Sequence, residues 1–183
     1  MMIIIMGLPG AGKTTVLDGA KKLHPEYTHL NYGTLMFEIA REKFKIENRD
    51  QIRTLDAKQQ KAVQAAVGKR LAKEKGKVIL DTHCSVLNPQ KGFYLPGLPY
   101  SLLKGLSVDM LVLITGDIEE IAARRSNDPS RARAANKDEI MAHDQHNRML
   151  IAAYSALSGA PVKIIVNRNG KADEAVKELS AVL

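Results

Sequence analysis

Short apolar runs alternate with longer polar segments along most of the chain. Runs of this kind, bounded by turn residues and rich in Val, Ile, Leu and Met, are typical of buried strands. The sequence predicts five of them, at 2–6, 27–31, 77–81, 110–115 and 162–166. Apolar strands that alternate with helices favour a parallel sheet covered on both faces. We therefore expect one three-layer α/β/α domain over residues 1–183, with a five-stranded parallel sheet.

The segments between these runs carry helix signals. Asp56 with Gln59, and Asn136 with Glu139, have the spacing of helix N-caps, and Gly76 is a residue type that follows helix ends. Helices are predicted at 14–23, 34–44, 56–75, 117–126, 136–157 and 172–182. The proline- and glycine-rich segment 87–100 is predicted to be a shaped loop, and 127–136 to be irregular.

Composition excludes several classes of protein. The chain has 183 residues, 45% hydrophobic and 26% charged, as expected of one globular domain. No apolar run is long enough to span a membrane, and the first residues read as a strand and not as a signal peptide. The single cysteine, Cys84, excludes an internal disulfide framework and a multi-cysteine zinc site. We expect a cytoplasmic protein in which Cys84 is a packed small residue.

The net charge is +7, from 27 basic and 20 acidic residues. Such a balance can attract nucleic acid or small polyanions. Only 4% of the residues are aromatic, and none is interleaved with the basic stretches for base stacking. Nucleic acid is therefore not the partner that the composition favours, and a phosphate-handling site explains part of the excess.

A glycine-rich loop follows the first predicted strand directly. It fits G-x-x-x-x-G-K-[ST] at every position, with Gly7, Leu8, Pro9, Gly10, Ala11, Gly12, Lys13, Thr14 and Thr15. Between a strand and a helix start, backbone N–H groups of such a loop cradle phosphate oxygens. Lys13 can then reach the outer phosphates, and the Thr14 hydroxyl can bind Mg²⁺. The motif predicts a P-loop NTPase fold that binds a nucleoside triphosphate.

A buried strand that ends in an aspartate resembles the second half of a nucleotide site. Asp81 ends the strand 77–81 and would hold Mg²⁺ or its water shell beside Thr14. Asp117, after the strand 110–115, is a rival, and either carboxylate could instead cap the turn that follows it. We favour Asp81 because no residue separates it from its strand.

Arginines are concentrated in the last third of the chain. Arg124, Arg125, Arg131 and Arg133 lie within ten residues, and Arg148 follows on the next predicted helix. Phosphoryl transfer needs cations and a lid that excludes water, and the planar guanidinium binds phosphate oxygens in pairs. A solvated basic face is the alternative. The scarcity of acidic residues among the first four arginines favours a lid.

Three other clusters are less decisive. The stretch 49–53 lies between two predicted helices and either binds a second phosphate or forms a polar turn; the spacing leaves both open. His143 and His146 at i and i+3 would make only half a metal site, so solvated or hydrogen-bonded histidines are favoured. His83, just after Asp81, is placed where it can contact substrate.

Five further stretches span almost the whole chain. They are 31–38 (NYGTLMFE), 49–53 (RDQIR), 81–83 (DTH), 92–99 (GFYLPGLP) and 159–165 (GAPVKII). Together with the phosphate loop, and in this order, they resemble the archaeal-type adenylate kinases. The first and fourth stretches are more specific than the phosphate loop, which many ATPases share.

The resemblance implies reversible transfer of the terminal phosphate of Mg-ATP to AMP. It implies a mobile AMP-side segment at about 33–75, a short lid at about 126–136 and a place for the ATP adenine near 167–170. It implies Mg²⁺ as the cofactor, held by Thr14 and Asp81, and ATP and AMP as the partners. Family members are associated with trimers, so we expect a homo-oligomer.

The resemblance also implies roles for single residues. Lys13, Arg124, Arg125 and Arg131 would bind the transferring phosphates and are the expected catalytic residues. The residues expected to contact substrate are Thr34, Arg53, His83, Tyr94, Gly97, Arg133 and Arg148.

The chain departs from the better-known bacterial adenylate kinases in two respects. Their long lid, with its extra strands or zinc knot, is missing. Their AMP-phosphate arginine aligns with Phe37, so Arg41, Arg53 or another residue must take that role. Two other functions stay open: a kinase for another small acceptor, and an ATP-dependent assembly factor that acts on ribosomal RNA or protein.

Overall fold

A five-stranded parallel sheet forms the centre of the molecule. The computed structural model describes residues 1–88, 91–127 and 136–183, apart from the side chains of Asp50 and Arg53. The strand order is β2-β3-β1-β6-β7, which confirms the predicted fold class. The strands are β1 (Met2–Gly7), β2 (Thr28–Asn31), β3 (Val78–Asp81), β6 (Met110–Thr115) and β7 (Val162–Val166). All six residues of β1 are buried, because helices cover both faces of the sheet at its centre.

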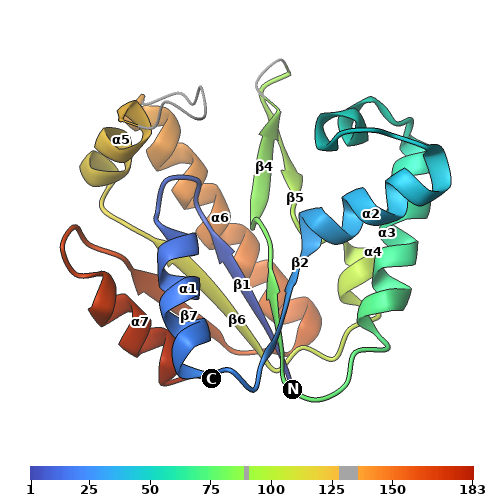
Figure 1. Ribbon diagram of the computed structural model, residues 1–183. Coiled ribbons are helices and arrows are strands. Elements are labelled where there is room, and N and C mark those ends of the chain that lie inside the picture. The colour runs from blue at the N-terminus through green and yellow to red at the C-terminus, as the bar shows by residue number, and fades with distance from the viewer. Residues whose placement is uncertain (89–90, 128–135) are drawn as a thin grey trace.

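Helices pack on both faces of the sheet (Figure 1). They are α1 (Lys13–Leu23), α2 (Tyr32–Phe44), α3 (Ala57–Leu71), α4 (Tyr100–Leu103), α5 (Ile118–Ser126), α6 (Lys137–Ser158) and α7 (Ala172–Ser180), with a 3-10 helix η1 (Arg49–Thr54) between α2 and α3. Alternate residues of β1 enter two cores. Ile4 packs with α2, α3, α4 and α6, whereas Ile3 packs with α1, α5 and α7. None of the described helices is both long and apolar enough to cross a bilayer.

The prediction of a loop at 87–100 was wrong. The chain forms an antiparallel hairpin of β4 (Ser85–Asn88) and β5 (Phe93–Pro96), and α4 then begins at Tyr100. The hairpin stands beyond the end of the main sheet, between α6 and α2 in Figure 1. Pro96, whose ring suggested a loop, is tolerated because it ends a strand of a two-stranded ribbon with open edges.

The other predicted boundaries agree with the structure to within two residues, except at the end of α3. This helix ends at Leu71 and not near Lys75, and Gly76 adopts the expected left-handed backbone (φ 82°) only after a further turn. The predicted caps are present. Asp56 and Gln59 form a capping box, and the Asn136 side chain accepts from the backbone N–H of Glu139. The predicted irregular segment lies mostly in 128–135, outside the described residues.

Candidate functional site

The glycine-rich loop lies at the carboxyl end of β1 and leads into α1 (Figure 1). Gly10 (φ 89°) and Gly12 (φ 78°) adopt left-handed backbone, which side chains disfavour. A Cβ on Gly7 would come within 3.0 Å of the Lys13 side chain, so the lysine stem packs directly against the loop backbone. The loop therefore has the backbone turns and the helix start that the motif predicts for a phosphate cradle.

Two side chains from distant parts of the chain hold this loop. The Arg125 guanidinium, from α5, donates to the Pro9 carbonyl through Nε (2.9 Å) and Nη2 (2.7 Å). Asn167, which follows β7, donates from Nδ2 to the Ala11 carbonyl at 2.8 Å. Both side chains are almost fully buried, at 9% and 5% exposed. These hydrogen bonds hold the loop backbone in its turns.

Lys13 pairs with Asp81 at the carboxyl edge of the sheet. The two residues meet because β1 and β3 are adjacent parallel strands that end at the same edge. Burial lowers the pKa of the Lys13 ammonium to about 8, and the charge of Lys21 adds to this shift. Lys13 pairs with Asp81 Oδ1, and the other carboxylate oxygen, Oδ2, accepts a hydrogen bond from Asn31 Nδ2 at 2.8 Å.

The two candidate aspartates have different contacts. Asp117 is the N-cap of α5 and accepts from the backbone N–H groups of Glu119 (2.9 Å) and Glu120 (3.3 Å). Asp81 instead faces the phosphate-loop lysine. Thr14, in the exposed first turn of α1, supplies a hydroxyl. Thr14 and Asp81 offer a hydroxyl and a carboxylate, which are oxygen donors of the kind that suits Mg²⁺. The described residues contain no group of three His, Cys, Asp or Glu side chains that could hold a metal ion.

The two described arginines of the predicted cluster, Arg124 and Arg125, have different contacts. Arg125 contacts the loop, as described above. Arg124 pairs with Glu120 (3.0 Å), one helical turn earlier, and donates from Nε to Asn169 Oδ1 at 2.9 Å. Its acidic partner therefore precedes the segment 124–133, in which the sequence analysis found few acidic residues. Its Nη2 also donates to the Asn167 carbonyl at 3.2 Å.

Arg148 on α6 donates from Nε to Asp144 (2.7 Å), and Asp144 accepts from the buried Thr115 hydroxyl at the end of β6. This arginine is therefore tied to the same edge of the sheet. Arg131 and Arg133 lie outside the described residues, as does most of the predicted lid.

The AMP-side candidates start where β2 passes into α2. Asn31 caps α2 by accepting from the Thr34 N–H at 3.0 Å, and it also accepts from Arg49 Nη2 at 2.8 Å. Sequence reasoning did not single out Arg49 from the stretch 49–53, because only the fold brings it to Asn31. Arg53 lies in η1, but its side chain is not described.

The remaining substrate candidates belong to the hairpin and its base. The Tyr94 ring stacks on His146 of α6 (4.4 Å between centroids, 17° between planes). A Cβ on Gly97 would lie 1.7 Å from the backbone oxygen of the exposed His83, so only glycine fits there. Gly97 thus has a structural reason to be present whether or not it contacts substrate.

A buried polar network joins the hairpin to α6. Ser85 Oγ lies 2.6 Å from Asn147 Oδ1 and 3.0 Å from His143 Nε2. His143 is buried, and its burial, with a smaller contribution from the charge of Arg125, lowers the pKa of this imidazole. Cys84 is fully buried as expected, and burial raises the pKa of its thiol to about 12.

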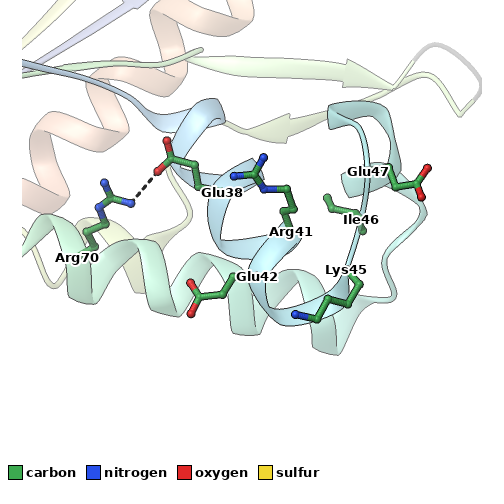
Figure 2. Close-up of a pocket in the computed structure, with 7 residues that line it drawn as sticks. All are labelled: Glu38, Arg41, Glu42, Lys45, Ile46, Glu47 and Arg70. Carbon is green, nitrogen blue, oxygen red and sulfur yellow. Dashed lines mark hydrogen bonds and ion pairs between the residues drawn. The ribbon is translucent and has the colours of Figure 1, made fainter.

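An open pocket of about 860 Å³ lies elsewhere, on the exposed side of α2 (Figure 2). Its lining residues are Glu38, Arg41, Glu42, Lys45, Ile46, Glu47 and Arg70. Acidic and basic residues are equal in number, and Arg70 pairs with Glu38 at 2.8 Å. The lining includes neither the phosphate loop nor Asp81, so we place the candidate site at the carboxyl edge of the sheet.

Comparisons with known proteins identify the family of the chain. A family model described as an AAA domain matches residues 6–142. The adenylate kinase of Methanothermobacter thermautotrophicus is 44% identical over 100% of this chain and 98% of its own length. That of Methanopyrus kandleri is 45% identical over 97% of this chain and 94% of its own length. That of Methanocaldococcus jannaschii is 42% identical over 100% of this chain and 97% of its own length.

Solved structures of low identity share the fold. A shikimate kinase from Bacteroides thetaiotaomicron covers 97% of its own chain and 100% of this one, with a TM-score of 0.61 and 14% identity. A shikimate kinase from Acinetobacter baumannii in complex with shikimate matches over 92% of its own chain and 99% of this one, with a TM-score of 0.56 and 17% identity. The predicted resemblance to archaeal-type adenylate kinases is confirmed by the full-length matches. The chain belongs to the family described as an AAA domain and to the adenylate kinases.

Proposed function

We propose that this protein transfers the terminal phosphate of Mg-ATP to AMP and releases two molecules of ADP. The observation that carries the proposal is the meeting of Lys13 and Asp81 at the carboxyl edge, between the phosphate loop and the start of α2. An AMP phosphate oxygen forms the new bond to the γ-phosphorus of ATP. The bond from that phosphorus to the β–γ bridging oxygen breaks, and ADP leaves.

The protein contributes position and charge. The loop held by Arg125 and Asn167 presents its N–H groups to the ATP phosphates, and Lys13 leaves Asp81 to bind their outer oxygens. Thr14 and Asp81 would hold Mg²⁺, which would supply positive charge beside the phosphate oxygens. This mechanism needs no general base of unusual pKa, because positioning and charge neutralisation supply the catalysis.

Finer parts of the proposal rest on the family resemblance. Arg124, Arg125 and Arg131 neutralise the transferring phosphate, the segment 126–136 closes as a lid, and 33–75 moves over AMP. Thr34, Arg53, His83, Tyr94, Gly97, Arg133 and Arg148 contact substrate. The protein acts as a cytoplasmic homotrimer and uses neither a membrane nor nucleic acid.

A coupled assay with Mg-ATP and each of AMP, CMP, UMP, GMP, shikimate and water tests the reaction. Rapid ADP formation with AMP alone is the expected result. Transfer to another acceptor would make the protein a different small-molecule kinase. ADP formation with water alone would favour the assembly-factor alternative.

The substitution Lys13→Ala tests the assignment of the site. We expect it to reduce turnover by at least about a hundredfold, because it removes the cation at the transferring phosphate. Lys22→Ala, an exposed lysine of the same helix, is the matched control and should keep wild-type turnover. Turnover of the Lys13 variant close to that of the wild type would refute the assignment.

A further inference from the structure

A continuous series of polar contacts links the phosphate loop to the start of η1. Lys13 pairs with Asp81, and Asp81 Oδ2 accepts from Asn31 Nδ2 at 2.8 Å. The other end of the same amide, Asn31 Oδ1, accepts from Arg49 Nη2 at 2.8 Å. Four side chains from α1, β3, β2 and η1 are therefore joined, although Lys13 and Arg49 are far apart in sequence.

Asn31 is the link that cannot be replaced by most residues. It lies opposite Asp81 in the parallel ladder of β2 and β3, at the last pair before both strands end. An asparagine amide has a donor end and an acceptor end, and here each end is used on a different side. Its Oδ1 also accepts from the Thr34 N–H (3.0 Å) and hydroxyl (3.2 Å), so the amide is held in one orientation.

Arg49 is held only by uncharged acceptors in these contacts. Besides Asn31, it donates from Nη2 to the Thr34 hydroxyl (3.3 Å) and from Nε to the Gly33 carbonyl (3.3 Å). A Cβ on Gly33 would lie 2.4 Å from Arg49 Nη2, so the guanidinium rests directly on that backbone. Arg49 is exposed, and its guanidinium can bind an anion near the first turn of α2, at the edge of the sheet.

We propose that Asn31 is a positioning residue that links the Lys13–Asp81 pair to Arg49 and makes affinity for the acceptor monophosphate depend on occupancy of the triphosphate site. The inference rests on the proposed function. When the triphosphate site is empty, Lys13 neutralises Asp81. When the Mg-bound triphosphate draws Lys13 away, the partner of the Asp81 carboxylate changes, and the Asn31 amide, bound to Asp81 at one end and to Arg49 at the other, carries that change to the residue that holds the acceptor phosphate.

Two substitutions separate this link from the role of Asn31 as a helix cap. Asn31→Asp keeps oxygen acceptors for Thr34 and Arg49 but removes the donor to Asp81 and adds a second carboxylate beside it. Asn31→Ser keeps an N-cap hydroxyl that is too short to reach both sides. Asn48→Asp, a matched change at the N-cap of η1 with no contact to Asp81, is the control.

The measurement is the dissociation constant of AMP with and without a saturating, non-hydrolysable Mg-bound ATP analogue, by calorimetry on the full-length protein. In the wild type and in Asn48→Asp we expect the analogue to tighten AMP binding about fivefold or more, in the range of ordinary site-to-site coupling. In both Asn31 variants the ratio should fall to about one, and in Asn31→Ser the dissociation constant of the analogue itself should change little. The double variant Asn31→Ser/Arg49→Gln should bind AMP no more weakly than Arg49→Gln alone.

The outcomes separate the inference from the proposed function. If the wild type neither binds AMP nor phosphorylates it, the proposed function is wrong, and the inference is overturned with it. If the wild type phosphorylates AMP but the Asn31 variants keep its coupling ratio, only the inference is overturned. The same holds if the wild-type ratio is already one. Loss of thermal stability with unchanged coupling would show that Asn31 is a helix cap and nothing more.

Discussion

The bond from Asn167 to the Ala11 carbonyl should determine how well the phosphate loop is organised. Asn167→Ala removes the donor and leaves the carbonyl of a fully buried residue without this partner. An orphaned buried acceptor costs about 1–3 kcal/mol of the free energy of unfolding. For a chain of this size, a loss of about 2 kcal/mol lowers Tm by about 4–8 °C.

The same substitution should weaken ATP binding more than it changes the fold. Without the bond, the loop backbone samples other turns, and part of the binding energy of ATP is spent on reordering it. We expect the KM for ATP to rise several-fold while the KM for AMP stays near the wild-type value. Asn167→Asp, which keeps the shape but places an acceptor against the Ala11 carbonyl, should be at least as damaging.

Thermal unfolding and steady-state kinetics on the same preparations test this reasoning. Lys177→Ala, at an exposed position of α7, is the control and should leave both Tm and the KM for ATP unchanged. An Asn167→Ala variant with the wild-type Tm and the wild-type KM for ATP would show that the hydrogen bond does not organise the loop.

Two further predictions concern Lys13 and Gly97. Burial lowers the pKa of Lys13 from 10.5 to about 8, so in the free protein its side chain loses a proton, and with it the positive charge, as pH rises through about 8. The dissociation constant of an ATP analogue should be flat below that pH and rise by up to about tenfold per unit above it; Lys13→Met should abolish this rise, and a rise that persists would assign it to another group. Gly97→Ala would place a Cβ 1.7 Å from the His83 carbonyl oxygen and should lower Tm through displacement of the hairpin base, whereas Gly92→Ala, with open space around its Cβ, should cost only the strain of its left-handed backbone (φ 67°). Equal Tm values for these two glycine variants would contradict the packing argument.

Local sequence patterns were sufficient for the main sheet and the phosphate loop. The five strands are short apolar runs, and an apolar run bounded by turn residues needs no distant information to be recognised. The glycine motif is likewise local, because its backbone turns and helix start depend on consecutive residues. The caps at Asp56 and Asn136 were predictable for the same reason, since each side chain bonds to its own helix.

The β4–β5 hairpin was missed because its local signals conflict. Each strand has only four residues, and the prolines and glycines around them favour a loop. The hairpin is held by contacts that a sequence window cannot contain: Ser85 with His143 and Asn147, and Tyr94 with His146. The end of α3 was misplaced because Gly76 shows only that the helix ends before this residue. The helix in fact ends at Leu71, before Gly76 is reached.

The sequence by itself determined the chemistry of the candidate site: a phosphate loop, a lysine, a strand-end aspartate and a supply of arginines. The tertiary structure decided which of these residues meet. Asp81 rather than Asp117 faces Lys13, Arg125 and Asn167 hold the loop, and Arg49 reaches Asn31. The physical reason is strand order. Adjacent parallel strands end at one edge of the sheet and bring together side chains whose separation along the chain carries no sign of their contact.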